Sequence, residues 1–294
     1  MNKHFLVTVS FDSADITGVG FLCSFFQKLS EHQVTLFHIC RLDSNNMNST
    51  LLEMWEGPAG EGTPEITVGA QRALEKAKYM LAKSHMSVDE LITKTFEERY
   101  GKVRDILNEG TEGLYDAIVL GKRASYTLQS FFERAADETA QKIIQESTLS
   151  TPLWICPEPD CQRKNVLVCV DGSENGLRVV DHVGYIISQQ PQHSLTLFHV
   201  QQGGGPSSAE IFTAAKDILL KDHNILESRI HTDTSWGMSV AGTIMSYAEK
   251  NGFAVIAFGL RGIQEGMFKT MKLAGGTASS LIAKTDKISL WCCP

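Results

Sequence analysis

Residues 259–277 form a glycine-rich segment whose composition suits the binding of a phosphate group. Gly259 and Gly262 would let the backbone approach a ligand closely, because glycine has no side chain in the way. Gly276 and Thr277 directly precede the sequence "ASSLIAK", which predicts a short helix, so free backbone N–H groups and a hydroxyl would point toward an anion. Glycine-rich turns are also common as plain connections, and that second interpretation stays open.

The distribution of charge favours an anion in the second part of the chain. The glycine-rich segment contains Arg261, Lys269 and Lys272 against a single acid, a net charge of +2. Residues 161–294 carry 12 Lys and Arg against 11 Asp and Glu, a net charge of +1, whereas residues 1–160 carry 15 against 23, a net charge of −8. The total of −7 argues against a general nucleic-acid-binding protein, which needs a basic surface.

Length and composition predict a globular protein with two domains. The chain has 294 residues, of which 43% are apolar. Its longest apolar runs, such as Phe253 to Phe258, are far below the roughly 18 residues that span a membrane. We therefore expect a cytoplasmic protein without a membrane partner. The seven cysteines lack the spacing of a metal site, and Cys292 and Cys293 would point to opposite faces of a strand, so we expect buried reduced thiols.

The chain contains two copies of one sequence. Residues 5–39 align without a gap with residues 166–200, both copies contain T-L-F-H, and "PLWICP" corresponds to the terminal "SLWCCP". We interpret residues 1–157 and 165–294 as two domains of one kind, joined by a polar linker at 158–164.

Strand and helix patterns alternate in each copy, which predicts α/β domains with a five-stranded, doubly wound parallel sheet. In the second copy the expected strands are residues 166–170, 194–200, 228–234, 253–259 and 288–293. The first copy carries a long polar insertion from Asp43 to Gly69, interpreted as a mobile excursion or, alternatively, as a loop that binds a partner.

Ligands of open parallel sheets bind beyond the carboxyl ends of the strands. Asp171-Gly172, Val200 and the glycine-rich segment would all lie at that edge of the second sheet. His38 and His199 repeat at the ends of equivalent strands. We interpret them as hydrogen-bonded structural residues, with a ligand or switch role as the alternative.

The pairing of "VLVCVDGSENG" with "VIAFGLRG…GGTASSLI" and a terminal "SLWCCP" resembles the universal stress proteins, and the doubled chain looks like their tandem form. The resemblance covers nearly the whole chain. It implies a Rossmann-like fold of the adenine nucleotide alpha hydrolase-like type and a stress-response protein that binds ATP or a related adenine nucleotide, with Mg²⁺ beside it. The residues that would bind the nucleotide, by position, are Asp171, Gly172, Val200, Gly259, Arg261, Gly262, Gly276 and Thr277.

One departure concerns the length of the glycine-rich segment. Nucleotide-binding members of the family usually have nine residues between the second glycine and the G-[S/T] pair, whereas thirteen residues, Ile263 to Gly275, stand there in this chain. The extra residues would bulge outward or would misdirect the N–H groups.

The first copy departs further from the family pattern. Ser10-Phe11 replaces Asp171-Gly172, Ala124 replaces the second glycine, and Asp137-Glu138 replaces Gly275-Gly276. An alternative register places Arg134-Ala135 at the last pair and does not restore the glycine. Because two carboxylates would repel a triphosphate, we expect no nucleotide in the first copy.

The main hypothesis is a regulatory nucleotide-binding protein rather than an enzyme, although slow ATP hydrolysis is compatible with it. The alternative is a stress-responsive interaction module that binds protein partners without nucleotide. A third interpretation, an enzyme that transfers adenylyl groups, lacks a visible acceptor site. The matched "PLWIC" and "SLWCC" strands predict an internal pseudo-twofold dimer of the two copies, and assembly into a homodimer stays open.

Overall fold

Strands and helices alternate along the chain, as the hydrophobic pattern predicts. The computed structural model describes residues 2–40, 66–87, 90–121, 150–202, 206–260, 277, 280–282 and 287–294. The first part contains β1 (His4–Thr8), α1 (Thr17–Phe25), η1 (Leu29–Glu31), β2 (Gln33–Cys40), α3 (Val68–Lys83), β3 (Leu91–Glu97), α4 (Lys102–Glu112), β4 (Ala117–Gly121) and β5 (Leu153–Cys156). The second part contains β6 (Val166–Cys169), α7 (Glu174–Ile187), β7 (Leu195–Gln201), α8 (Ser208–Asp217), η4 (Ile218–Asp222), η5 (Glu227–Arg229), β8 (Ile230–Trp236), α9 (Val240–Lys250), β9 (Val255–Gly259) and β10 (Ser289–Cys293).

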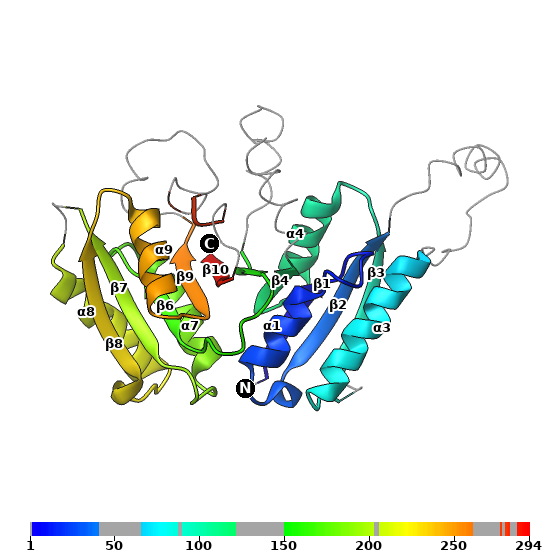
Figure 1. Ribbon diagram of the computed structural model, residues 1–294, viewed down its shortest axis with the longest axis horizontal. Coiled ribbons are helices and arrows are strands. Elements are labelled where there is room, and N and C mark those ends of the chain that lie inside the picture. Colours follow the sequence, from blue (N-terminus) through cyan, green and yellow to red (C-terminus); the bar gives the residue numbers. More distant parts are fainter. Residues whose placement is uncertain are drawn as a thin grey trace.

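The strands form one ten-stranded sheet in the order β3-β2-β1-β4-β5-β10-β9-β6-β7-β8 (Figure 1). Neighbouring strands are parallel within β1–β5 and within β6–β10, and both halves have the same strand order. The two predicted doubly wound parallel sheets are thus present. The domain limits at residues 157 and 165 stay a prediction.

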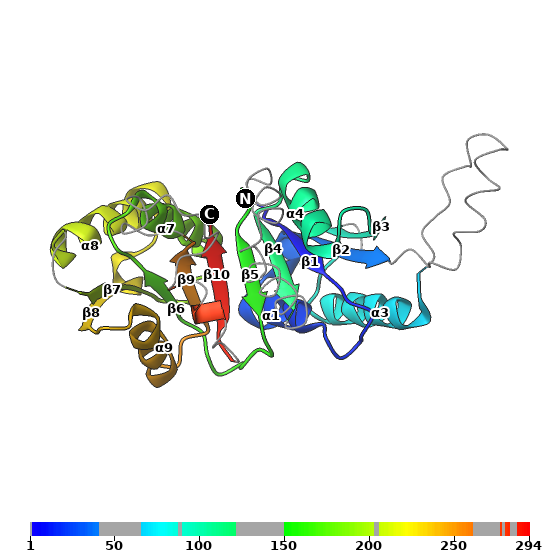
Figure 2. The ribbon, with the colours of Figure 1, turned by 90° about the horizontal axis from the view of Figure 1, so that it is seen from above.

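The two halves of the sheet meet through β5 and β10, which pair antiparallel with Trp154 opposite Trp291. This pairing of the "PLWIC" and "SLWCC" segments agrees with the expectation from the sequence. Figure 2 shows the carboxyl terminus at this joint, in the middle of the sheet.

Helices cover both faces of the sheet because successive strand residues point to opposite sides. Phe5 and Val7 belong to one apolar cluster with residues of α1, α3, α7 and α8, whereas Leu6 belongs to the other cluster with residues of α4 and α9. Figure 2 shows α7 and α8 on one side of the second half of the sheet and α9 on the other. Within the described part of the chain, no helix is long and apolar enough to cross a bilayer.

The carboxyl end of the predicted insertion belongs to a helix. We expected the insertion to extend to Gly69, but α3 begins at Val68, because the Thr67 side chain accepts a hydrogen bond from Ala70 N and caps the helix. Residues 41–65 lie outside the described residues, and both interpretations of the insertion stay predictions.

All seven cysteines have free thiols, but the expected burial holds fully only for Cys40, Cys156, Cys292 and Cys293, because Cys23 and Cys169 are partly buried and Cys161, in the linker, is exposed. Cys292 packs in the cluster beneath α9, and its neighbour Cys293 packs in the cluster beneath α7. Burial raises the pKa of both thiols far above their usual range, so they act as small apolar residues of the core.

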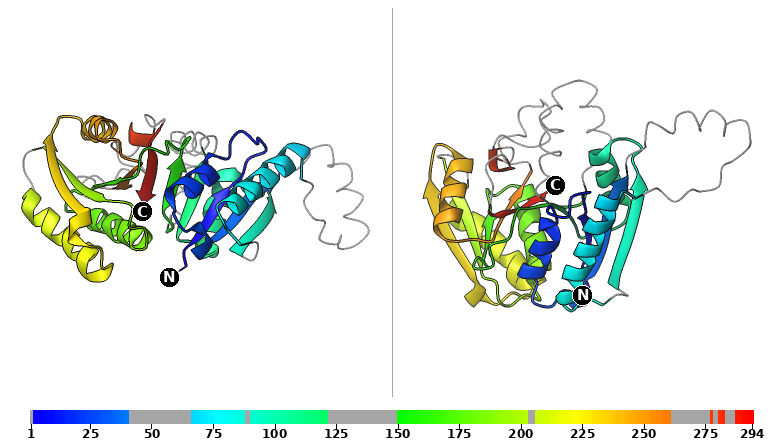
Figure 3. Two further views of the ribbon diagram at one scale, coloured as in Figure 1. Left: turned by 60° about the horizontal axis from the view of Figure 1, so that its bottom comes forward. Right: turned by 45° about the vertical axis from the view of Figure 1, so that its right-hand side comes forward.

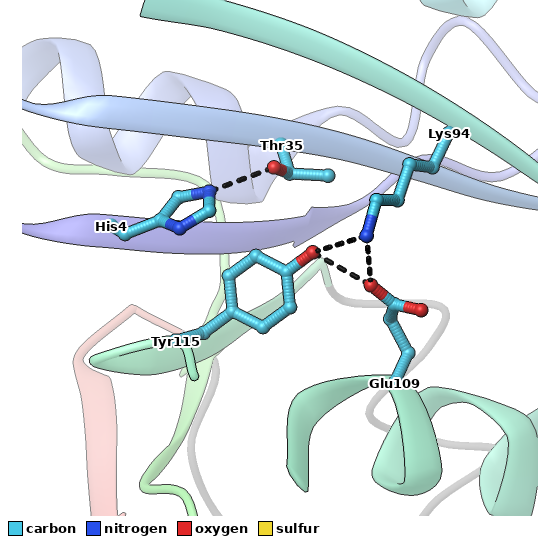
Figure 4. Close-up of polar contacts among 5 residues, drawn as sticks. All are labelled: His4, Thr35, Lys94, Glu109 and Tyr115. Carbon is cyan, nitrogen blue, oxygen red and sulfur yellow. Dashed lines mark hydrogen bonds and ion pairs between the residues drawn. The ribbon is translucent and has the colours of Figure 1, made fainter. Parts of the chain in front are cut away.

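A polar bridge joins the third strand of each half to the helix that follows it. In the first half Lys94 Nζ lies 2.7 Å from Glu109 Oε1 and 3.2 Å from the hydroxyl of Tyr115 (Figure 4). In the second half the Tyr247 hydroxyl donates to Asp233 Oδ2 at 2.6 Å. The bridge has the same position in both halves but different chemistry.

Candidate functional site

Three adjacent strands position the described residues of the predicted nucleotide site. β6 lies between β7 and β9, and all three run parallel. Asp171 follows β6, Val200 is the penultimate residue of β7, and Gly259 ends β9. The carboxyl ends of parallel strands meet at one edge of a sheet, so these three residues lie along the same edge. The chain reverses its winding direction here, since β7 follows β6 on one side and β9 lies on the other.

Asp171 and Ser173 build the turn that leads into α7. Asp171 Oδ1 accepts hydrogen bonds from Ser173 N at 2.9 Å and from Ser173 Oγ at 2.6 Å. Ser173 Oγ accepts in turn from Gly176 N at 3.0 Å and caps the helix. The carboxylate is therefore held by its own turn at the amino end of a helix, where the helix dipole favours negative charge.

Gly172 is required by its backbone conformation and by packing. Its φ is +82°, a region that favours glycine. A Cβ at this position would lie 3.1 Å from both Pro206 Cγ and Ile211 Cγ1. Gly172 thus allows the segment before α8, and α8 itself, to pack closely against the turn.

His199 has the hydrogen-bonded structural role expected from the sequence. His199 Nδ1 lies 2.8 Å from the carbonyl oxygen of Val170, and His38 Nδ1 lies 2.8 Å from that of Val9. These contacts are equivalent in the two copies and tie the second strand of each half to the end of the first strand. The neighbouring Val200 is partly buried and packs against the cluster beneath α9.

Gly259 connects the site edge with the joint between the two halves. It pairs with Cys293 of β10, and Leu260 N donates to the Cys293 carbonyl at 2.9 Å. Arg261, Gly262 and Gly276 lie outside the described residues, and their place in a site stays a prediction. Thr277 is helical and partly buried, as are Ser280 and Ile282.

Sequence reasoning missed two amide side chains at this edge. Gln201 Nε2 donates to Ser208 Oγ at 3.0 Å, and Gln202 Nε2 donates to the Met238 carbonyl at 3.4 Å. Both glutamines directly follow Val200, so their position just past the strand was a signal available in the sequence. They connect β7 to the start of α8 and to the segment after β8.

The equivalent turn of the first half contacts α3. Lys76 Nζ of α3 donates to the carbonyl of Ser13 at 2.9 Å, and a Cβ on Gly69 would lie 2.8 Å from the Phe11 carbonyl oxygen. The helix therefore packs directly onto the turn that replaces Asp171-Gly172. Ala124, the Arg134-Ala135 pair of the alternative register, and Asp137-Glu138 lie outside the described residues, so the expected absence of nucleotide stays a prediction.

Among the described residues, no cluster of three or more His, Cys, Asp or Glu side chains could hold a metal ion. A Mg²⁺ ion accompanying a nucleotide would depend mainly on the phosphate oxygens, because Mg²⁺ usually needs only one or two protein carboxylates there.

No protein-family model matches the chain, and no curated protein matches it. Among solved structures, a universal stress protein in complex with cAMP is 19% identical; the match covers 44% of this chain and 95% of that chain, with a TM-score of 0.34. A putative universal stress protein from Pseudomonas aeruginosa UCBPP-PA14 is 13% identical, with 99% of this chain and 93% of that chain covered and a TM-score of 0.48. A universal stress protein from Lactobacillus plantarum is 18% identical, with 44% and 97% covered and a TM-score of 0.34. These three solved structures are universal stress proteins, the family that the sequence motifs resemble.

Proposed function

We propose that the chain is a regulatory stress-response protein whose second half binds ATP or a related adenine nucleotide. The observation that carries the proposal is the common edge of β7, β6 and β9, where Val200, Asp171 and Gly259 lie at the ends of three adjacent parallel strands. That is the place where open α/β sheets bind their ligands.

The chemistry of these residues suits different parts of a nucleotide. The Asp171 carboxylate can accept hydrogen bonds from an amino or hydroxyl group, so it would contact the nucleoside rather than the phosphates. Gly259 begins the glycine-rich segment whose three basic residues would contact the phosphates. The net charge of +1 in residues 161–294 supports an anion in this half.

A role in regulation fits better than catalysis. The candidate residues supply groups that bind and orient, and the structural histidine His199 already contacts the Val170 carbonyl. One solved structure that the chain resembles is a complex with cAMP, also an adenine nucleotide, which supports the ligand class.

Equilibrium dialysis of the full chain against ATP, AMP and cAMP, with and without Mg²⁺, tests the proposal. We expect saturable binding of at least one of these nucleotides below millimolar concentration. We also expect loss of binding in Gly276→Asp, which places a carboxylate where the first copy has Glu138. Ser246→Asp is the matched control, because it adds the same charge at an exposed position of α9. Absence of binding at millimolar nucleotide would contradict the proposal and favour the interaction module.

Limited trypsin digestion gives a second measurement on the same full chain. If the glycine-rich segment contacts the phosphates, cleavage after Lys269 and Lys272 slows when nucleotide is added, whereas cleavage after Arg41 does not. Equal rates with and without a nucleotide that binds would show that the segment is only a connection.

A further inference from the structure

The joint between the two halves of the sheet is built from aromatic rings. Trp154 of β5 and Trp291 of β10 stack with ring centroids 4.0 Å apart and an interplanar angle of 6°. Both indoles are fully buried. Figure 3 shows the carboxyl-terminal strand β10 (red) next to α7 (green) and near α1 (blue), and Phe21 and Phe25 of α1 contact the Trp291 ring.

Two histidines of the second half are part of this joint. Trp154 Nε1 donates to His182 Nε2 at 3.1 Å, so His182 accepts through a nitrogen that must be unprotonated. The His193 ring stacks on Phe25 with centroids 3.9 Å apart, and its Nε2 lies 2.9 Å from the Phe25 carbonyl oxygen. Protonation of His182 at Nε2 would break its hydrogen bond with Trp154, because the indole N–H would then face a second N–H donor.

A third histidine supports a lysine that crosses the joint. His32 is fully buried, its Nδ1 accepts a hydrogen bond from Lys3 N at 3.3 Å, and its Nε2 has no hydrogen-bond partner among the described residues. The Lys3 side chain is 1% exposed, and its Nζ lies 3.4 Å from the centroid of the Tyr185 ring of α7.

The charged groups that face these histidines are mostly positive. The positive charge of Lys3 lowers the pKa of both His32 and His182, and the charges of Arg229 and Lys164 lower that of His193. The charge of the amino terminus also lowers the pKa of His32, whereas Glu31 raises it. Asp116 is the acid that faces Lys3 and raises its pKa. An added proton would therefore meet like charge, and at His32 and His193 it would also be fully buried.

We propose that the joint between the two halves opens reversibly in acid, because protonated His32, His182 and His193 no longer fit among its aromatic rings and cations, while each half keeps its own fold. The joint thus responds to pH independently of any nucleotide.

The direction of the pH effect follows from the histidine pKa values. Burial lowers the pKa of His32 to about 4, with Lys3 adding to the shift. Burial also lowers the pKa of His182 and of His193. These side chains are neutral in the closed joint, whereas in contact with water they take up protons below about pH 6.5. The equilibrium constant for closing the joint has its full value above that pH. It falls by up to about tenfold per histidine for each pH unit below it, until the lowered pKa of that histidine is reached.

The test uses the full chain with Trp55→Phe and Trp236→Phe, which leaves Trp154 and Trp291 as its tryptophans. We expect the near-ultraviolet circular dichroism of the stacked pair to disappear reversibly between pH 6.5 and about 4, while the far-ultraviolet signal persists. Hydrogen exchange, corrected for its intrinsic pH dependence, should accelerate in β5 and β10 before it does in β1 and β6.

Substitution by glutamine, which cannot be protonated but still accepts a hydrogen bond, identifies the groups responsible. The triple variant His32→Gln, His182→Gln, His193→Gln should stay closed at least one pH unit lower, and His231→Gln, at an exposed position of β8, should not change the midpoint. If the triple variant does not fold at pH 7.5, each single variant should lower the midpoint by a smaller amount. The proposal is overturned if the tryptophan signal persists to pH 4, if it disappears together with the far-ultraviolet signal, or if none of the variants that fold changes the midpoint.

Discussion

At the residue scale, equivalent positions of the two copies differ at the centre of the joint. His182 of α7 accepts a hydrogen bond from Trp154, and the aligned position in α1 is Phe21. Trp291 Nε1 is buried and has no hydrogen-bond partner among the described residues. A buried N–H group without a partner destabilises a fold by about 1–3 kcal/mol. The two stacked indoles therefore differ in what they contribute to stability.

This difference predicts unequal effects of one substitution at two positions. Trp154→Phe and Trp291→Phe both remove an indole from the stack, but only the first leaves His182 without its donor, and only the second removes a donor that lacks a partner. We expect Trp154→Phe to lower the free energy of unfolding by about 1–3 kcal/mol more than Trp291→Phe. Urea unfolding at pH 7.5 measures both, and equal losses would show that Trp291 Nε1 has a partner such as a bound water.

At the element scale, the polar bridge between the third strand and the following helix uses an ion pair in one half and a tyrosine in the other. Tyr247 also stacks on Phe198, with ring centroids 4.2 Å apart. Burial raises the pKa of Tyr247 to about 12, and the hydrogen bond to Asp233 adds to the shift. The bridge therefore depends on a neutral phenol.

We predict that Tyr247→Phe keeps the ring stack and removes the hydrogen bond, which lowers the free energy of unfolding at pH 8 by about 0.5–1.5 kcal/mol. Because the pKa of Tyr247 is raised in the folded state, its contribution is complete below about pH 10 and disappears as the pH rises toward 12. The difference between wild type and variant should then shrink from pH 8 to pH 11.

Urea unfolding at the two pH values measures this change, with Tyr100→Phe as the control because Tyr100 is exposed. A difference that stays constant would mean that the hydrogen bond to Asp233 does not depend on the neutral phenol.

At the scale of the whole molecule, the joint protects the strands at which the two halves meet. Each half alone would end in an open edge, β5 or β10, with unpaired backbone groups and an exposed tryptophan. In the described sheet only β3 and β8 are edge strands. The antiparallel pair of β5 and β10 thus covers both of these edges within one chain.

We predict that a fragment of residues 165–294 self-associates through β10, because that strand loses its partner β5. Light scattering after size-exclusion chromatography should give a dimer or larger species for the fragment. At equal molar concentration, the full chain should give fewer chains per particle. A fragment that folds and stays monomeric would contradict the prediction and would show that β10 is covered in another way.

The amino-acid sequence by itself determined the doubled α/β organisation and the pairing of the "PLWIC" and "SLWCC" strands. Strands such as β6 and β9 could be recognised because burial on both faces needs continuous apolar runs, and the repeated T-L-F-H placed His38 and His199 at equivalent strand ends. The edge that carries Asp171, Val200 and Gly259 followed as well, since parallel sheets place the ends of their strands together.

Tertiary structure alone decided the contacts between residues far apart in the chain. Lys3 lies over Tyr185, and Trp154 donates to His182, although nothing in the local sequence of either pair indicates its partner. The packing of Pro206 and Ile211 against Gly172 belongs to the same class. The spacing of apolar residues and the residue types in turns report only on structure within a few residues. These contacts instead depend on how the two halves and their helices pack, and only the folded chain brings those groups together.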